Sequence, residues 1–387
     1  MNNFIYKNPT KIIFGKGQIE QINTELPKDA RILMVYGGGS IKRNGVYEQV
    51  IRAVGNRKLI EFPNVPANPE YDHLIEAVKI IREEKLNYIL AIGGGSVIDG
   101  TKFISAAAKY DGEDPWQIVC GTAPIKKAIP FGTVLTIPAT GSEMNAGAVI
   151  SRRALKEKRP FDSPLVYPQF SVLDPQVMIT LPTRQIANGI VDATMHVLEQ
   201  YMTYPVGGHL QDRFAEGIMK TLIEEGPKVM ANPANYEAAA SLMWSCTLAL
   251  NGLIAQGVPT DWGVHAIGHE FTAIFGIDHA RTLAIVAPRY YEYLLQEKRE
   301  KLVQYANRVW NISSGNDDER ALQGIQKLEN FCQSLGINTH LSDYTEEYEG
   351  TAEEIEKRFI ERKWSGIGER AQVTPEDVKK IVLKTYK

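Results

Sequence analysis

Three of the chain's seven histidines, His265, His269 and His279, lie within one short segment. His265 and His269 are four residues apart, so on a helix their side chains lie one above the other on the same face. Earlier in the chain, Asp192 and His196 have the same spacing and could bind one ion at two points. One aspartate and several imidazoles form a donor set for zinc or ferrous iron rather than for calcium or magnesium. These residues therefore indicate a transition-metal site, but their spacing leaves open which histidines bind the metal.

Each of these pairs has an ordinary alternative, because lone histidines and aspartate–histidine pairs at helical spacing are common in cores and on surfaces. Their concentration favours the metal, since five of the seven histidines fall between His196 and His279. His269 is followed by Glu270, but Ala273 stands where zinc proteases with the HExxH motif have their second histidine. The sequence therefore predicts a metal site that does not perform this protease chemistry.

Two apolar runs lead directly into glycines, in MVYGGGS at residues 34–40 and in AIGGGSVIDGTK at residues 91–102. A glycine costs about 1 kcal/mol in ordered structure, so three in a row need a reason. Without side chains, backbone N–H groups at the start of a helix can face a pyrophosphate. The alternative is a pair of tight turns between strand and helix. Neither run is a GxGxxG or GK[ST] motif, so the pattern favours nucleotide binding and gives little support to phosphoryl transfer.

The elements that must position these groups follow two patterns along the chain. In the first part, short apolar runs typical of buried strands alternate with segments of helical periodicity. We expect strands at residues 31–36, 88–92, 131–137 and 170–173, and helices at residues 70–85 and 96–110. This alternation predicts a parallel sheet covered on both faces. Because the turns after parallel strands converge at one edge, Thr136, Thr140 and Ser142 are expected to line the same groove as the glycines.

From Thr183 onward the patterns are almost entirely helical, and Thr374 with Pro375 predicts the start of one of the last helices. Further helices are expected at residues 183–201, 209–225 and 235–256, and around His265. We therefore predict an α/β dinucleotide-binding domain with a parallel sheet at residues 1–182. It is followed by an all-α metal-binding and substrate domain at residues 183–387. A small-molecule site is expected in a cleft between the two domains.

Composition narrows the class of protein. With 387 residues and 44% hydrophobic content, the chain is long enough for two domains. Its net charge of -3, from 43 basic and 46 acidic residues, gives no reason to expect nucleic acid or a membrane surface as a partner. Three cysteines without CxxC spacing argue against a disulfide framework and a thiolate zinc site. No signal segment or long apolar run is visible, so we expect a cytoplasmic protein.

Four motifs together resemble the iron-containing (group III) alcohol dehydrogenases. They are GGGSxxD from Gly93, PATGSE from Pro138, D-x3-H from Asp192 and H-x3-H-x9-H from His265. The similarity covers essentially the whole chain in order and spacing. Within the family, YGGGSIKRNG and LNGLIAQGVPTDW resemble the butanol dehydrogenase and broad-specificity NADPH-dependent aldehyde reductase branch. The resemblance implies the two-domain architecture that these enzymes share with dehydroquinate synthase.

The resemblance also implies roles for individual residues. One divalent ion, Fe²⁺ or Zn²⁺, would be bound by Asp192, His196, His265 and His279. His269 would lie beside the nicotinamide and is a candidate proton relay. The expected NADP(H)-binding residues are Gly37, Gly38, Ser40, Asn68, Gly94, Gly95, Ser96, Asp99, Thr136, Thr140, Ser142 and Lys158. Lys158 aligns with a family lysine near the cofactor, although its basic segment, RRALKEKR at residues 152–159, could equally be a solvated loop.

The preferred dinucleotide follows from the residues after the first predicted strand. A carboxylate at this place would bind a ribose hydroxyl and repel a phosphate. The chain has Gly37, Gly38 and Ser40 there and no acid, and Lys42 and Arg43 follow. Space and a hydroxyl group therefore favour NADP over NAD.

The implied reaction is reversible hydride transfer between NADPH and short-chain aldehydes or primary alcohols such as butanal and butanol. The metal would stabilise an alkoxide or polarise a carbonyl, and the nicotinamide would carry the hydride. Asn145, Val149, Ile254 and Trp262 are candidate walls of the substrate pocket. The resemblance also implies a homodimer.

Two other activities share the predicted architecture: a polyol dehydrogenase of the glycerol type and a metal-dependent lyase like dehydroquinate synthase. A phosphorylated or polyanionic substrate should bring several basic residues to the helical domain. Around His265 to His279, only Arg281 is found. The alcohol dehydrogenase reading is therefore favoured.

Overall fold

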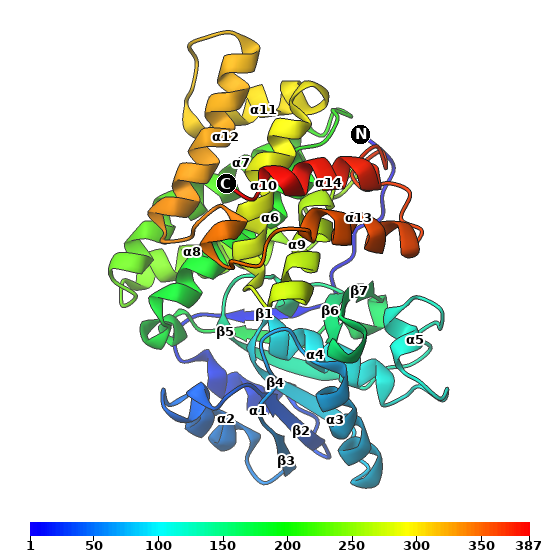
Figure 1. The fold of residues 1–387 in the computed structure, drawn as a ribbon. Helices are drawn as coiled ribbons and strands as arrows, with labels where there is room; N and C mark the ends of the chain where they lie inside the picture. The colour runs from blue at the N-terminus through cyan, green and yellow to red at the C-terminus, as the bar shows by residue number, and fades with distance from the viewer. The chain divides into compact units, whose positions relative to one another are not determined.

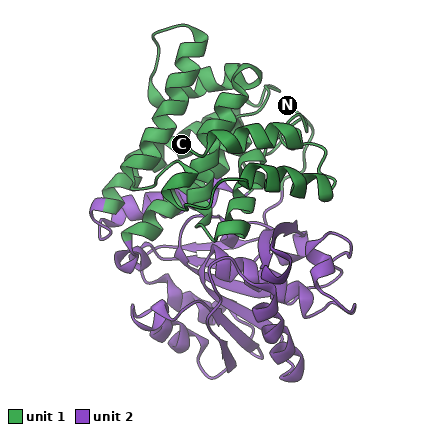
Figure 2. Cartoon of the chain, viewed as in Figure 1, with its two compact units in different colours: residues 1–6, 183–230, 252–387 green, residues 7–182, 231–251 purple.

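The computed structural model describes residues 1–387, and the chain separates into two compact units (Figure 2). Unit 1 comprises residues 1–6, 183–230 and 252–387, and unit 2 comprises residues 7–182 and 231–251. The predicted N-terminal domain included residues 1–6, which belong to unit 1, and the predicted C-terminal domain included residues 231–251, which belong to unit 2. The domain limits at residues 182 and 183 stay a prediction.

Unit 2 is built on a parallel sheet of six strands in the order β1-β8-β5-β4-β2-β3. The strands are β1 (Lys11–Phe14), β2 (Arg31–Tyr36), β3 (Lys58–Phe62), β4 (Tyr88–Gly94), β5 (Phe131–Ile137) and β8 (Phe170–Leu173). A separate antiparallel hairpin is formed by β6 (Gly147–Arg152) and β7 (Glu157–Asp162). Every residue of β4 and β8 is buried, as expected for central strands of a parallel sheet.

Helices cover both faces of this sheet (Figure 1). They include α1 (Ile22–Glu25), α2 (Val46–Val54), α3 (Tyr71–Glu83) and α4 (Gly95–Ala107). Unit 2 also contains α5 (Trp116–Val119), which packs against β7, and α8 (Tyr236–Ala249), which packs against residues 142–144 and 175–180. α3 and α4 pack against each other, and α1 packs against α2. Right-handed crossovers place α3 and α4 on one face and α2 on the other, because the chain moves in opposite directions along the sheet.

Unit 1 is built from helices, with one isolated antiparallel bridge between Ile367 and Val373. Its helices are α6 (Thr183–Tyr201), α7 (His209–Ala231), α9 (Gly263–Phe275), α10 (His279–Tyr293), α11 (Leu295–Trp310), α12 (Asp317–Ser334), α13 (Thr351–Glu361) and α14 (Pro375–Lys384). α10 is the central element, since most of its residues are buried and it packs against α6, α9, α12 and α14. α14 begins with a capping box in which Thr374 caps the N–H of Asp377, which confirms the helix start predicted there.

Short 3-10 helices complete both units. They are η1 (Gln18–Gln21), η2 (Ser40–Lys42), η3 (Ser142–Met144), η4 (Arg153–Leu155), η5 (Pro164–Val166), η6 (Pro175–Thr180) and η7 (Leu341–Asp343). No helix in the structure combines the length and the apolar character that crossing a membrane requires.

The predicted fold class is confirmed: a parallel sheet with helices in the N-terminal part and helices alone afterwards. The four predicted strands are β2, β4, β5 and β8. One expectation was wrong in detail, since the helix expected at residues 235–256 ends at Ala249. RRALKEKR contains the turn of the β6–β7 hairpin, in which residues 153–156 are exposed, whereas Lys158 is buried at 8% exposure.

Candidate metal centre and dinucleotide site

Two candidate metal ligands lie on one buried face of α6. Asp192 and His196 are one helical turn apart, and Nδ1 of His196 lies 3.7 Å from Oδ1 of Asp192. Both residues are buried in unit 1, where α6 packs against α10. Oδ1 of Asp192 is buried and accepts no hydrogen bond. A carboxylate at this depth requires a positive partner, so this atom fits a bound cation.

The other two candidates come from α9 and α10. α9 ends at Gly276, which has the left-handed conformation of a helix C-cap, and α10 begins at His279. This reversal brings the ring of His279 to 5.2 Å from that of His265, measured between centroids. The ring of His265 is also 4.7 Å from that of His196 on α6. Three helices therefore bring four candidate ligands together.

These four residues, Asp192, His196, His265 and His279, are called the metal tetrad below. One donor atom from each lies within 4.8 Å of the others. Two donors that share a tetrahedral zinc ion at about 2.1 Å are about 3.4 Å apart, so the tetrad is close to the dimensions of a closed site. Oδ1 of Asp192 is 3.7 Å from Nε2 of His279. Since its donors are one carboxylate and three imidazoles, the tetrad fits a divalent transition-metal ion.

His269 lies beside the tetrad but is not part of it. Its ring is 5.1 Å from that of His279 and 6.1 Å from that of His265. The side chain of His279 is 22% exposed, whereas those of the other tetrad residues are almost fully buried. Spacing alone did not decide which histidine of the H-x3-H pair joins the cluster, and the structure selects His265.

Two buried carboxylates, to which the sequence assigned no role, support the start of α9. The side chain of Glu199 on α6 accepts hydrogen bonds from the backbone N–H of Val264 and His265 and contacts Nδ1 of His265. Burial raises the pKa of the Glu199 carboxyl, and the charge of Asp261 adds to the rise, while the two N–H bonds oppose it. The position of Glu199, three residues after His196, was the available signal, because it places both side chains on adjoining parts of one face.

A second buried carboxylate holds the turn before α9. Asp261 accepts hydrogen bonds from the N–H of Gly263 at 2.8 Å and from the hydroxyl of Tyr290 at 2.7 Å, and it pairs with Lys298 at 2.8 Å. Trp262, which lies between Asp261 and Gly263, has the left-handed values φ 65° and ψ 11°. This backbone conformation is strained for a large aromatic residue. The ring of Trp262 lies 5.3 Å from that of His265. The turn is thus fixed where it carries an aromatic group against the tetrad.

The glycine runs of unit 2 meet at a topological switch point. β3 lies on one side of β2 and β4 lies on the other, so the chain leaves β2 in one direction and returns in the opposite one. Gly37 and Gly38 follow β2, and Gly94 and Gly95 end β4 and begin α4. In open α/β sheets, ligands bind outside the carboxyl ends of the strands at such a point. The sheet order therefore supports the predicted dinucleotide site.

Glycine is required for different physical reasons in the two runs. A Cβ on Gly95 would lie 2.6 Å from Thr140, and a Cβ on Gly94 would lie 2.8 Å from Ile137, so close packing requires these glycines. A Cβ on Gly38 would meet nothing within 4 Å. The start of α4 has no side-chain cap and no acid in its first turn. Its N–H groups and dipole therefore fit a phosphate, and Gly38 borders open space.

Three predicted cofactor residues from distant parts of the chain are in contact. Nζ of Lys158 on β7 donates a hydrogen bond to Oδ1 of Asn68 at 2.9 Å. The backbone N–H of Asn68 donates to Oγ of Ser96, in the first turn of α4, at 3.3 Å. Asn68 has φ 59°, a left-handed value that asparagine tolerates better than most residues. The structure therefore brings an ammonium, an amide and a hydroxyl group to the start of α4.

The remaining predicted residues form the adjoining turn. Asp99 is buried and accepts a hydrogen bond from Oγ of Ser142 at 2.5 Å and one from the N–H of Val149 at 2.9 Å. Thr140 Oγ1 accepts from the N–H of Ser142 at 3.2 Å, and Thr136 is buried at the end of β5. Burial raises the pKa of Asp99. In this structure Asp99 and Ser142 link α4 to its neighbouring loops, and their cofactor role stays a prediction.

Three basic or amide side chains of unit 2, Lys102, Asn145 and Lys42, already have partners within the protein. Nζ of Lys102, fully buried, donates to Oδ1 of Asn145 at 2.8 Å, and burial lowers its pKa to about 8. Asn145, expected as a wall of the substrate pocket, is therefore a structural link. Lys42 beside Ser40 pairs with Glu61 at 2.9 Å, and Glu61 also accepts bonds from two tyrosine hydroxyls. The Glu61 carboxylate thus accepts from Lys42 and from the hydroxyls of Tyr36 and Tyr47, all in unit 2.

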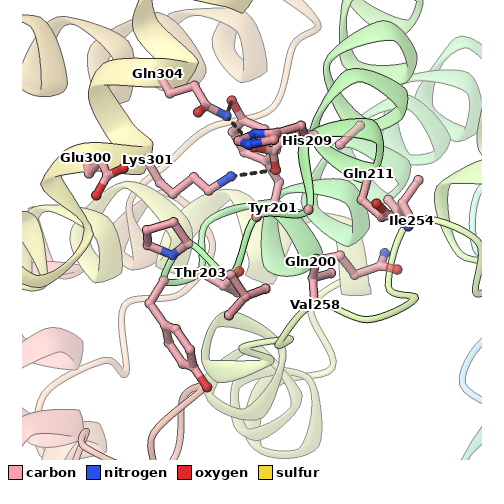
Figure 3. Close-up of a pocket in the computed structure, with 17 residues that line it drawn as sticks. Gln200, Tyr201, Thr203, His209, Gln211, Ile254, Val258, Glu300, Lys301 and Gln304 are labelled. Atoms are coloured by element: carbon pink, nitrogen blue, oxygen red, sulfur yellow. Dashed lines mark hydrogen bonds and ion pairs between the residues drawn. The ribbon is translucent and has the colours of Figure 1, made fainter. Parts of the chain in front are cut away.

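A pocket of about 70 Å³ lies in unit 1 and contains none of the tetrad residues (Figure 3). It is lined by the end of α6, the start of α7 and part of α11. Lys301 pairs with Asp212 at 2.5 Å, and Gln304 donates to the hydroxyl of Tyr201 at 2.8 Å. Ile254, predicted as a wall of the substrate pocket, lines this separate pocket, and its predicted role stays untested. Because its charged groups satisfy one another, we assign this pocket no chemical role.

Known proteins resemble the chain over its whole length. The sequence model of the iron-containing alcohol dehydrogenases matches residues 9–175, and that of the C-terminal region of the same family matches residues 186–386. The chain is 52% identical to the NADPH-dependent aldehyde reductase YqhD of Escherichia coli, over 97% of each protein. It is 44% identical to the probable NADH-dependent butanol dehydrogenase 1 of Bacillus subtilis, over 89% of this chain and 90% of that protein.

The fold agrees equally well. The crystal structure of YqhD from E. coli K-12 superposes with a TM-score of 0.97 at 50% sequence identity and covers 99% of both chains. The resemblance inferred from the four sequence motifs is therefore confirmed by sequence and by fold. The chain belongs to the iron-containing alcohol dehydrogenase family.

Proposed function

We propose that the protein is a metal-dependent, NADP(H)-linked alcohol dehydrogenase and aldehyde reductase. Its substrates would be short-chain aldehydes and primary alcohols such as butanal and butanol. The observation that carries the proposal is the metal tetrad, with its four donors within 4.8 Å of one another in a chain of this family. Similarity to an NADPH-dependent aldehyde reductase supports aldehyde reduction as the reaction and NADPH as the cofactor.

In this proposal Asp192, His196, His265 and His279 hold one ion, Fe²⁺ or Zn²⁺, in the domain formed by residues 183–387. When bound, such an ion polarises an aldehyde carbonyl, and a reduced nicotinamide supplies the hydride. The protein fixes the four donors on three packed helices, so little reorganisation is needed at the moment of reaction. The partial exposure of His279 marks the side of the tetrad that a substrate can approach.

The dinucleotide would be held by the domain formed by residues 1–182. The N–H groups at the start of α4 would bind the pyrophosphate, next to Ser96 and Asn68. Lys158 is a cation that this region offers to a further phosphate, and its contact with Asn68 holds it there. The open space at Gly38 admits a 2′-phosphate where a carboxylate would repel it. These features favour NADP over NAD.

His269 is proposed as the proton relay. Its ring lies 5.1 Å from that of His279, so it is close to the tetrad without belonging to it. Imidazole titrates near neutral pH and can give a proton to a newly formed alkoxide or take one from an alcohol. Trp262, whose ring packs against His265, would form part of the apolar wall that excludes water.

Removal and return of the metal tests this function. Protein dialysed against a chelator should lose NADPH consumption with butanal and recover it with Zn²⁺ or Fe²⁺ but not with Mg²⁺. The variant His279→Ala should lose both activity and bound metal, whereas His209→Gln, a histidine outside the tetrad, should keep both. Full activity in chelator-treated protein proved free of metal would refute the proposal. Light scattering on the purified protein would test the homodimer that the family resemblance suggests.

A further inference from the structure

Glu199 is a buried carboxylate that touches a metal-tetrad residue. Its side chain is 1% exposed, and it lies on α6, the helix that also carries Asp192 and His196. Its two oxygens reach the first turn of α9. Oε1 accepts from the N–H of Val264 at 2.6 Å, and Oε2 accepts from the N–H of His265 at 3.2 Å. The same Oε2 contacts Nδ1 of the His265 ring.

These contacts determine which ring nitrogen of His265 carries the proton. Both oxygens of Glu199 accept backbone N–H bonds, as those of an ionised carboxylate do, and an ionised carboxylate has no hydrogen to donate. Beside the ionised form, the atom that meets Oε2 is therefore a protonated Nδ1. The opposite nitrogen, Nε2, is then unprotonated and has a lone pair for a cation. Imidazoles that bind metals commonly donate their other N–H to a carboxylate, which fixes the tautomer and the ring orientation.

We infer that Glu199 is a positioning residue that holds His265 in the tautomer and orientation required for metal binding. This inference rests on the proposed function, since it takes His265 as a ligand. Glu199 lies on the helix of Asp192 and His196 and bonds to the helix of His265. One side chain therefore sets the distance between two of the three helices that form the tetrad.

The charges around Glu199 agree with this role. The neighbouring lysine, Lys298, pairs with Asp261 and with Glu369 at 2.5 Å, so its charge is engaged by these two carboxylates. No lysine or arginine contacts the Glu199 carboxylate, so its partners are the N–H groups of α9 and the imidazole. A cation bound to the other side of that imidazole supplies the positive charge that a carboxylate at this depth requires.

The test compares Glu199→Gln with Glu216→Gln. The amide is nearly isosteric and cannot accept through both ends, so at least one of the three bonds is lost. Glu216 is the matched control, because it is a carboxylate of unit 1 at 5% exposure that bonds to Tyr201 and Arg308 and contacts no tetrad residue. Metal-free proteins are titrated with Co²⁺, followed by its visible absorption, and with Zn²⁺ against a competing chelator.

We expect Glu199→Gln to weaken metal binding by roughly 10- to 100-fold and Glu216→Gln to leave it within about twofold. A second measurement observes the ring proton of His265 directly. In zinc-loaded protein labelled with ¹⁵N-histidine, the Nδ1–H proton of His265 should appear far downfield, as a hydrogen bond to a carboxylate requires. It should move upfield in Glu199→Gln. A purely structural role for Glu199 would not predict this shift.

The possible negative results distinguish the proposed function from the inference about Glu199. If the native protein binds no ion, the proposed function and this inference fall together. If it binds the ion and Glu199→Gln binds it equally well, only the inference falls. Should the glutamine variant not fold, Glu199→Asp keeps the charge with a shorter reach and is expected to bind the metal with intermediate affinity. A zinc-loaded native protein whose His265 ring is protonated at Nε2 would also overturn the inference.

Discussion

Asp192 and His279 lie on different helices, yet Oδ1 of Asp192 is 3.7 Å from Nε2 of His279. This distance is too long for a hydrogen bond and close to the separation of two donors that share one ion. Nδ1 of His196 lies at the same distance from the same oxygen. One carboxylate oxygen thus has two imidazole nitrogens around it at the spacing that a bound cation produces.

Replacement of His269 by glutamine separates metal binding from proton transfer. Because His269 is outside the tetrad, His269→Gln should retain metal at the native level. Loss of a proton relay should lower kcat by roughly 100-fold or more and remove a titration near neutral pH from the rate profile. Steady-state kinetics between about pH 6 and pH 9, with metal analysis of the same samples, checks both parts. A variant with native kcat would remove His269 from the mechanism.

A carboxylate at Gly38 should reverse the cofactor preference. The structure has room for the side chain, since a Cβ there meets no atom within 4 Å. Placing two negative charges together costs several kcal/mol, so Gly38→Asp should lower kcat/KM for NADPH relative to NADH by roughly 100-fold. Gly38→Ala tests the effect of size without charge. If the ratio of kcat/KM for NADPH and NADH is the same in Gly38→Asp as in the native protein, the 2′-phosphate does not bind at Gly38.

Gly95 should prove necessary for packing as well as for phosphate binding. Its Cβ would lie 2.6 Å from two atoms of Thr140, so the neighbouring loop must shift to accommodate alanine. We expect Gly95→Ala to lower the free energy of unfolding by about 1–3 kcal/mol, the usual cost of overpacking. Gly38→Ala, which meets no atom, should change it far less. Urea unfolding without cofactor measures the free energy of unfolding of both variants. Equal values for Gly95→Ala and Gly38→Ala would contradict the close packing of Gly95 against Thr140.

Stability should fall as Glu369 loses its proton. Burial and the hydrogen bond with Asp261 raise the pKa of Glu369 from 4.5 to about 7, although Lys298 opposes the rise. Between these two values the folded chain keeps a proton that the unfolded chain has released. The contribution of this group to the free energy of unfolding is therefore complete below the lower value and is lost as the pH rises to the upper one. Glu369→Gln should show a smaller decrease over this range, and identical pH dependence would contradict the raised pKa.

Much of the fold was readable because burial leaves a strong pattern. β2 and β4 are almost continuous apolar runs that end in glycine, and both were predicted. β3, the edge strand with the sequence KLIEF, and the charged β6–β7 hairpin were missed because exposed strands lack such runs. The end of α8 at Ala249 was also missed, since apolar residues continue past it.

The candidate site was readable where its residues are close in the chain. Asp192 with His196 and His265 with His269 have helical spacing, which identified them as candidates. The contact of Glu199 with His265 depends on how α6 packs against the start of α9, and no local pattern encodes that packing. The same holds for Lys158 and Asn68, which meet only when the β6–β7 hairpin folds next to α4.

The central claim is that one ion is held by Asp192, His196, His265 and His279. Crystals of metal-loaded protein, measured on both sides of the zinc or iron absorption edge, give an anomalous map that locates the ion directly. We predict a single strong peak in each chain, at about 2.0–2.2 Å from one donor atom of each of the four residues. A peak bound elsewhere, or a loaded protein whose four side chains diverge around no ion, would contradict the account.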